Sequence, residues 1–91
     1  MANENKYQRK LIKRYESEGW FVLRLTTATC TFSKTGIPDL VAMKKNSDGS
    51  FRVKFIEVKA EGGTASALQL YTIKKLKEFG FEAVVDVEKI L

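Results

Sequence analysis

Residues 36–59 read GIPDLVAMKKNSDGSFRVKFIEVK, and this stretch decides the fold. It contains two apolar runs, 37–43 and 51–58, separated by a polar segment with Asp48 followed by Gly49. Asp-Gly between two apolar runs is a strong β-hairpin signal, because both residue types tolerate the left-handed backbone of a tight turn. We therefore predict a pair of antiparallel strands at the centre of the domain.

The hairpin brings two short motifs together. Folding the chain back about Asp48 lays Asp39, of Gly-Ile-Pro-Asp-Leu, opposite Glu57, of Glu-Val-Lys, within one residue of register. Side chains alternate along a strand, so Glu57 and Lys59 project from the same face. The pattern predicts two carboxylates and one ammonium at one edge of a sheet. Taken alone, Pro-Asp also fits an ordinary turn and Glu-x-Lys an ordinary solvated strand.

Such a cluster favours a bound divalent cation. Two adjacent carboxylates repel each other, and one of them would tend to stay protonated. Mg²⁺ prefers oxygen ligands and usually binds through one or two carboxylates together with water and phosphate. Asp39 and Glu57 are the candidate ligands, and the carbonyl of Val58 offers a third oxygen. Lys59 would lie beside the reactive water and either lower its pKa or hold it for in-line attack.

Size and composition predict one soluble domain. The chain has 91 residues, of which 44% are hydrophobic, so we expect a single domain over residues 1–91. No apolar run approaches the roughly 20 residues of a membrane span, and no signal-peptide pattern opens the chain. The single cysteine, Cys30, cannot form an internal disulfide. We therefore expect a reducing, cytoplasmic setting.

The residue types that are missing narrow the chemistry. The sequence contains no histidine, which excludes a His-based triad, a His-ligated zinc site and a His general base. One cysteine cannot build a structural zinc site, and Cys30 lacks a histidine partner, so we interpret it as an incidental thiol. Acid–base chemistry must therefore come from carboxylates, lysine or tyrosine.

A basic surface surrounds the acidic motifs. The net charge is +5, and the basic residues gather at 6–14, 44–45 and 74–77. Such a surface favours binding to a polyanion through counterion release, although it also promotes solubility. An acidic cluster within a basic surround is typical of a site that attracts nucleic acid and uses a metal ion.

The chain before the hairpin predicts a helix and a strand. Residues 4–18 suit a helix capped by Asn3 or Asn5, with apolar side chains at four-residue spacing: Tyr7, Leu11 and Tyr15. Glu4 falls on this inward stripe. It either favours the positive end of the helix dipole or reaches the Asp39/Glu57 cluster, and the spacing leaves both open.

Residues 20–25 form the first expected strand, with apolar residues on both faces, which suggests a sheet covered on two sides. The Thr-rich segment Thr26–Thr35 has no periodicity and precedes the acidic motif, so we expect a mobile loop beside the site. Phe32 and Lys34 within it could contact substrate. Phe32 could equally serve as a core or dimer contact.

The chain after the hairpin predicts a second helix, 66–79, and a last strand, 82–87. The inward stripe of this helix is Ala65, Thr72, Leu76 and Phe79. Gln69 falls within the stripe. Its amide could hold Lys59, the water or a phosphate, or it could lie at the exposed margin of the stripe. A helix between the third and fourth strands favours a mixed sheet with helices on its faces.

The chain resembles a known family of nucleases. The matching residues are, in order: Glu4 with Gln8, Gly19-Trp20, Gly36-Ile37-Pro38-Asp39-Leu40, Glu57-Val58-Lys59, and Gly63 followed by Ser66 and Gln69. In this order they resemble the PD-(D/E)xK nuclease superfamily, and most closely its standalone viral-type VRR-NUC domain. The resemblance covers Glu4 to about Val87. It implies a restriction-endonuclease-like α/β fold, a mixed β-sheet flanked by α-helices.

The resemblance also implies an activity. Members cleave phosphodiester bonds with Mg²⁺ or Mn²⁺, so Asp39 and Glu57 would be metal ligands and Lys59 the catalytic lysine. Glu4 matches the acidic residue of the first helix, and Gln69 matches the glutamine of the family motif. Standalone members are homodimers that act on branched DNA such as four-way junctions, and the viral type implies a phage- or prokaryote-encoded protein. Thr64 stands where the family often has Lys or Arg, which puts a substrate contact from that turn in doubt.

Two functions from different classes follow. The first is a metal-dependent DNA endonuclease acting as a homodimer. The second is a non-catalytic, structure-selective DNA-binding module with the same fold. The intact acidic set argues against the second, because carboxylates that face phosphate hinder binding unless a metal is used. RNA is not excluded as a substrate.

Overall fold

The computed structural model describes residues 4–25 and 36–90, which form two helices and one four-stranded sheet. The elements are α1 (Glu4–Ser17), β1 (Phe21–Arg24), β2 (Leu40–Lys45), β3 (Phe51–Lys59), α2 (Ala67–Glu78) and β4 (Glu82–Val87). The strand order is β1-β2-β3-β4. The first two pairings are antiparallel, and β3 pairs with β4 in parallel, so the expected mixed α/β sheet flanked by helices is confirmed.

The central hairpin has the expected register. Leu40 pairs with Ile56, so the next position outward sets Asp39 opposite Glu57. The strand β2 begins at Leu40 rather than at the expected Ile37. Pro38 lies between them, and it has no backbone N–H to donate to a ladder. The connection turns through Gly49, whose φ is +90°, and its N–H donates to the carbonyl of Asn46 at 3.0 Å.

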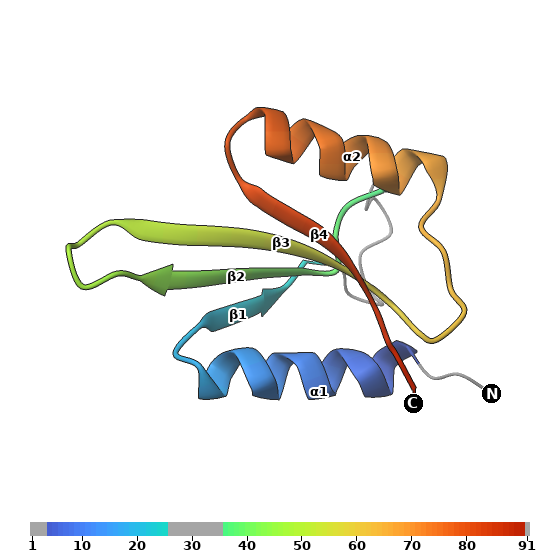
Figure 1. Ribbon diagram of the computed structural model, residues 1–91, viewed down its shortest axis with the longest axis horizontal. Helices are drawn as coiled ribbons and strands as arrows, with labels where there is room; N and C mark the ends of the chain where they lie inside the picture. Colours follow the sequence, from blue (N-terminus) through green and yellow to red (C-terminus); the bar gives the residue numbers. More distant parts are fainter. Residues whose placement is uncertain (1–3, 26–35, 91) are drawn as a thin grey trace.

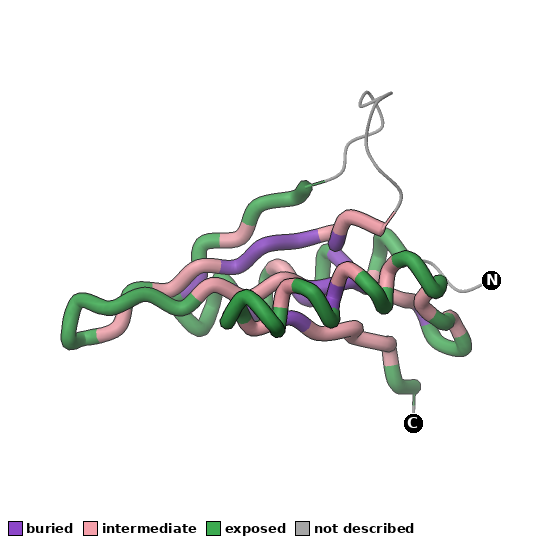
Figure 2. Tube along the Cα trace, turned by 90° about the horizontal axis from the view of Figure 1, so that it is seen from above, coloured by how far each residue is buried: buried purple, intermediate pink, exposed green. Residues whose placement is uncertain are grey.

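The two helices lie on opposite faces of the sheet (Figure 1). Helix α1 packs against β1 and β3, whereas α2 packs against β4 and β3. The core beneath α1 consists of Leu11, Tyr15, Trp20, Leu40, Ala42, Ile56 and Val58. Figure 2 shows the buried residues gathered in the middle of the molecule, with the hairpin end exposed. Burying these side chains supplies the main driving force for folding.

The expectation of a sheet covered on both faces is wrong at β1. The side chains of Phe21 and Leu23 are 62% and 42% exposed. In the sheet register Phe21 pairs with Met43, and Leu23 pairs with Val41. Helix α2 lies over β3 and β4, so among the described residues no helix packs over this side of β1. The apolar side chains of Phe21 and Leu23 in β1 therefore lie on an exposed surface of the sheet.

The inward stripe of the second helix is centred differently from the prediction. Phe79 was expected to point inward, but it is 80% exposed, whereas Ile73 is buried at 6% exposure. Phe79 is the C-terminal cap of α2, and Gly80 then turns the chain away with a φ of +101°. Phe79 keeps helical dihedrals (φ −77°, ψ −7°), so its exposure follows from its place at the end of α2 and not from a break in the helical period.

Two further expectations concern the ends of elements. Helix α1 begins at Glu4, so Asn5 lies in its first turn and is not the cap. Asn3 lies outside the described residues, as does the segment Thr26–Thr35 with Cys30, Phe32 and Lys34. Within the described part of the chain, neither helix has the length and hydropathy needed to cross a membrane.

Candidate active site

Three carboxylates converge at one end of the sheet. One oxygen from each of Glu4, Asp39 and Glu57 lies within 4.8 Å of the other two. Glu4 is the first residue of α1, Asp39 directly precedes β2, and Glu57 lies near the end of β3. Of the two interpretations of Glu4 that the spacing left open, the structure therefore shows that it reaches the cluster.

Backbone contacts fix the position of Asp39. Its Oδ2 accepts a hydrogen bond from the backbone N–H of Val58 at 2.8 Å, across the β2–β3 pair. Its own carbonyl accepts from the N–H of Leu25 at 2.8 Å, at the end of β1. The carboxylate is thus held against the strand that carries Glu57 and Lys59. The Val58 side chain is fully buried, and its expected role, as a carbonyl ligand, stays a prediction.

Gly36 allows the backbone that leads to Asp39 to run in close contact with α2. Gly36 has a φ of +99°, and a Cβ placed on it would lie 2.8 Å from Cγ of Leu68. It would also lie 3.2 Å from the Leu68 carbonyl oxygen and from Oγ1 of Thr72. Only glycine allows the Gly-Ile-Pro-Asp motif to pass so close to the helix.

Glu57 is buried at 2% exposure and is held by two side chains. Its Oε2 is 3.3 Å from Nζ of Lys59 and accepts a hydrogen bond of 3.1 Å from Nε2 of Gln69. Its other oxygen, Oε1, is buried and has no hydrogen-bond partner in the described structure. An unpaired buried carboxylate oxygen is costly unless a further group binds it.

The pKa of Glu57 reflects this environment. This pKa is raised from the ordinary 4.5 to about 7: burial is the largest cause and the nearby charge of Asp39 adds to it, while Lys59 opposes the rise. Two carboxylates and one ammonium leave an excess of negative charge in a poorly hydrated place. The arrangement is therefore suited to an additional cation.

Gln69 joins the second helix to this cluster. Ser66 caps α2: its Oγ accepts from the Gln69 N–H at 3.1 Å, and Oε1 of Gln69 accepts from the Ser66 N–H at 2.8 Å. The remaining amide nitrogen donates to Glu57. The sequence suggested a contact to Lys59, a water or a phosphate, whereas the structure shows Glu57 as the partner. The Ser-x-x-Gln spacing is itself a capping-box signature, and this signal could have indicated the contact between Gln69 and Ser66.

Lys59 is positioned from both sides. Its carbonyl accepts a hydrogen bond from the N–H of Glu88 at 2.9 Å, and in the sheet register it pairs with Val87 of β4. A Cβ on Gly63 would lie 3.4 Å from Cβ of Lys59, so the glycine turn fits closely around it. Thr64, in the same turn, is exposed.

The fold and the cluster together define an α/β nuclease-type domain, in which a mixed sheet sets an acidic residue opposite a Glu-x-Lys motif. The sequence model of the VRR-NUC domain matches residues 3–87. The chain therefore belongs to the VRR-NUC domain family, a family of nuclease domains that have DNA as their partner. No curated protein gives a match to the chain.

Proposed function

We propose that this protein is a metal-dependent endonuclease that hydrolyses phosphodiester bonds in DNA. The observation that carries the proposal is the convergence of Glu4, Asp39 and Glu57 within 4.8 Å, with the Lys59 ammonium 3.3 Å from Glu57. These residues come from three separate stretches of one small domain: the start of α1, the residue before β2, and the end of β3. Membership of the VRR-NUC family supports the same chemistry.

The donor set fits a hard divalent cation. All candidate ligands are oxygens, the preferred partners of Mg²⁺, and Mn²⁺ would substitute for it. The unpartnered Oε1 of Glu57 is the strongest support, because a buried carboxylate oxygen needs a partner that the described residues do not supply. Asp39 and Glu57 would hold the ion, with the Val58 carbonyl as a third donor and Glu4 as a further ligand or a contact through water.

The neighbouring residues have separate roles in this proposal. A bound cation supplies Lewis-acid chemistry to the phosphodiester. Lys59 holds the attacking water beside the phosphate and stabilises negative charge that develops there. Gln69 orients Glu57 through its amide and so acts as a positioning residue. Asp39 is kept in place by the Val58 N–H while it carries charge.

We propose branched DNA, such as a four-way junction, as the substrate and a homodimer as the active form. Two identical sites related by a two-fold axis suit a symmetric branched substrate. The apolar face of β1 and β2, where Phe21 and Leu23 are exposed and Met43 is half-buried, supports a second copy as its occupant, because a two-fold interface pairs like with like. The mass in solution would fall from dimer to monomer in Phe21→Ser with Leu23→Ser.

A panel of cleavage substrates tests the proposal. Matched duplex, single-stranded, flap and four-way DNA, with an RNA counterpart, would be incubated with Mg²⁺, with Mn²⁺ and with chelator. We expect metal-dependent nicking that is strongest on the four-way substrate. Asp39→Asn and Lys59→Ala should each lower the rate by roughly 10²–10³-fold while circular dichroism shows a retained fold. Retained cleavage in both variants would overturn the assignment.

The alternative function is a non-catalytic, structure-selective DNA-binding module. Tight binding to branched DNA without cutting, under Mg²⁺ and Mn²⁺ and across the same panel, would favour it. The buried Glu57 argues against it, since a desolvated carboxylate facing phosphate weakens binding when no cation is used.

A further inference from the structure

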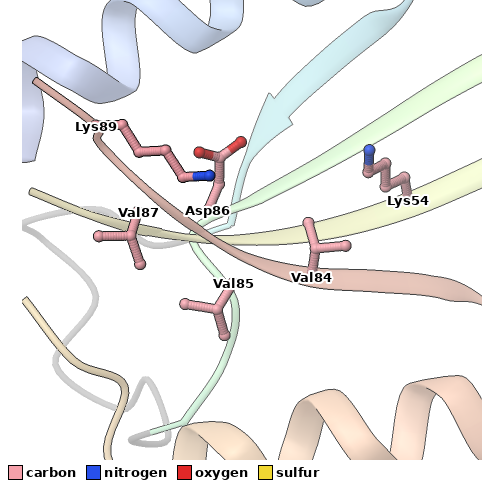
Figure 3. Close-up of a pocket in the computed structure, with 6 residues that line it drawn as sticks. All are labelled: Lys54, Val84, Val85, Asp86, Val87 and Lys89. Atoms are coloured by element: carbon pink, nitrogen blue, oxygen red, sulfur yellow. The ribbon is translucent and has the colours of Figure 1, made fainter. Parts of the chain in front are cut away.

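Two adjoining hollows lie along β4, on the side of the sheet that faces α1. Their volumes are about 380 and 400 Å³. Asp86, Val87 and Lys89 line both hollows, so the two adjoin along β4, and we call them together the β4 groove. Figure 3 shows the first of these hollows, in which Asp86 lies between Lys54 and Lys89. Helix α1 packs mainly on β1 and β3, and it reaches β4 through Asp86, which contacts Tyr7 and Arg14.

The lining of the β4 groove is mainly cationic. Four basic side chains line it, Lys10, Arg14, Lys54 and Lys89, against the two carboxylates of Asp86 and Glu88. Asp86 already accepts a hydrogen bond from the Tyr7 hydroxyl and lies 3.7 Å from Arg14. Lys10 and Lys89 are exposed and form no ion pair within the described ranges 4–25 and 36–90. Their charges remain available to an anion.

The β4 groove starts beside the acidic cluster. Val87, which lines both hollows, pairs with Lys59 in the sheet register, and the N–H of Glu88 donates to the Lys59 carbonyl at 2.9 Å. Tyr7, on the other wall, lies about one helical turn after Glu4. The groove therefore meets the cluster at Glu4, the first residue of α1, whereas Glu57 projects toward Gln69 of α2 on the other face of the sheet.

The outer edge of β4 adds neutral donors. Among the strands of the described residues, β3 is the only neighbour of β4, so β4 lies at the edge of this sheet. An edge strand presents a row of backbone N–H and C=O groups that no neighbouring strand pairs. Backbone N–H groups together with Lys and Arg side chains are common partners of nucleic-acid phosphates. The groove thus offers cationic side chains and backbone N–H donors along the same strand.

We propose that the β4 groove binds the phosphodiester backbone of DNA on one side of the cleaved bond. This inference rests on the nuclease function proposed above and adds a substrate-binding tract to it. Lys10 and Arg14 lie about 9 and 15 Å beyond Glu4 along the helix axis. One DNA strand advances about 3.4 Å per nucleotide, so these cations meet phosphates about three and four nucleotides from the cleaved bond.

Equilibrium binding with a matched charge control tests the groove. Lys10→Ala with Lys89→Ala removes two groove charges, whereas Lys74→Ala with Lys77→Ala removes two exposed charges from α2, on the other face of the sheet. Fluorescence polarisation of labelled duplex and four-way DNA would be followed at several salt concentrations, with chelator present. We expect the groove pair to weaken binding about tenfold and to lower the slope of log K against log salt by about 2.

The control pair should change both quantities much less. Equal effects of the two pairs would overturn the proposal, because binding would then follow net charge alone. Unchanged binding in the groove pair would overturn it too. Lys10 and Lys89 are both exposed, so thermal melting should stay unchanged. Chelator prevents cleavage, so binding is measured separately from catalysis. A wild type that binds DNA through the groove but does not cut it with Mg²⁺ or Mn²⁺ would contradict the nuclease function and leave the groove proposal intact.

Discussion

Gln69 donates a hydrogen bond of 3.1 Å from Nε2 to Oε2 of Glu57, and with its Oε1 the same amide caps its own helix. One side chain therefore ties the start of α2 to the most buried carboxylate of the cluster. Correct placement of Glu57 depends on correct formation of the helix end, because both contacts use a single rotamer.

Gln69→Ala and Ser66→Ala separate these two contacts. Each should cost about 1 kcal/mol of stability, because each breaks the capping box. Only Gln69→Ala removes the donor to Glu57, so it should raise the pKa of Glu57 further and slow cleavage by roughly tenfold or more. Thermal melts, a carboxyl-carbon NMR titration and cleavage rates would measure the three effects. Equal loss of cleavage in both variants would show that the helix cap alone matters.

The stability of the metal-free protein should depend on pH through Glu57. Its pKa is about 7 in the folded protein, and its ordinary value is 4.5. Between these values the folded protein keeps a proton that the unfolded chain releases, so the free energy of unfolding falls as the pH rises from about 4.5 to 7. The fall is at most about 3 kcal/mol.

Urea denaturation at pH 5, 6, 7 and 8 with chelator would measure this fall. Glu57→Gln keeps the shape and an acceptor for Gln69 but cannot titrate, so its profile should be flatter over the same range. Added Mg²⁺ should stabilise the wild type most at pH 8, where the carboxylate is ionised. A wild-type profile that matches that of Glu57→Gln would contradict the assigned pKa.

Gly36→Ala should disturb both stability and activity. The new methyl would lie 2.8 Å from Cγ of Leu68, in a backbone with a φ of +99°. Gly49, with a φ of +90° and no atom within 4 Å of such a methyl, is the matched control, because its substitution adds backbone strain alone. We expect Gly36→Ala to cost about 1–3 kcal/mol more than Gly49→Ala.

Cleavage reports the second effect of Gly36→Ala. Asp39 lies three residues on, so movement of the chain away from α2 should shift its carboxylate and lower the rate, whereas Gly49→Ala should leave the rate near the wild-type value. Adding Leu68→Ala to Gly36→Ala removes the closest of the contacted atoms and should restore part of the loss. If the cleavage rate does not recover, the loss comes from the strained backbone conformation at position 36 and not from the contact with the Leu68 side chain.

Local patterns were enough to predict the elements and the pairing of the hairpin. The register of Asp39 with Glu57 follows from counting out from Asp48-Gly49, because a tight turn fixes which residues face each other. The last strand, Glu82–Val87, coincides with the prediction. These features depend on contacts between residues that are close in sequence.

Features that depend on how the elements pack could not be predicted in the same way. The exposure of Phe21 and Leu23 follows from where α2 lies on the sheet, and no periodicity in β1 carries that information. The partner of Gln69 was open for the same reason. The structure brings Glu4, Asp39, Glu57, Lys59 and Gln69 close together, but their roles as metal ligands and as catalytic groups remain predictions, as does the role of the Val58 carbonyl.

Tyr7 and Asp86 illustrate a contact without a local signal, since 79 positions separate them and the hydroxyl donates to Oδ1 at 2.5 Å. Burial, and then Asp86, raises the pKa of Tyr7 to about 12. The ordinary value is 10.0, so the free energy of unfolding should fall as the pH rises from about 10 to 12. Absorbance at alkaline pH should show a tyrosinate component near pH 12 that disappears in Tyr7→Phe.

Two variants separate the causes of this shift. Tyr7→Phe should cost about 1 kcal/mol, because it removes the hydrogen bond while the ring stays packed. Asp86→Asn keeps an acceptor and the burial of the ring but removes the charge, so the pKa of Tyr7 should fall from about 12 and remain above 10.0, since burial is the larger cause. A fall to 10.0 in Asp86→Asn would mean that the carboxylate, and not the burial, holds the proton on Tyr7.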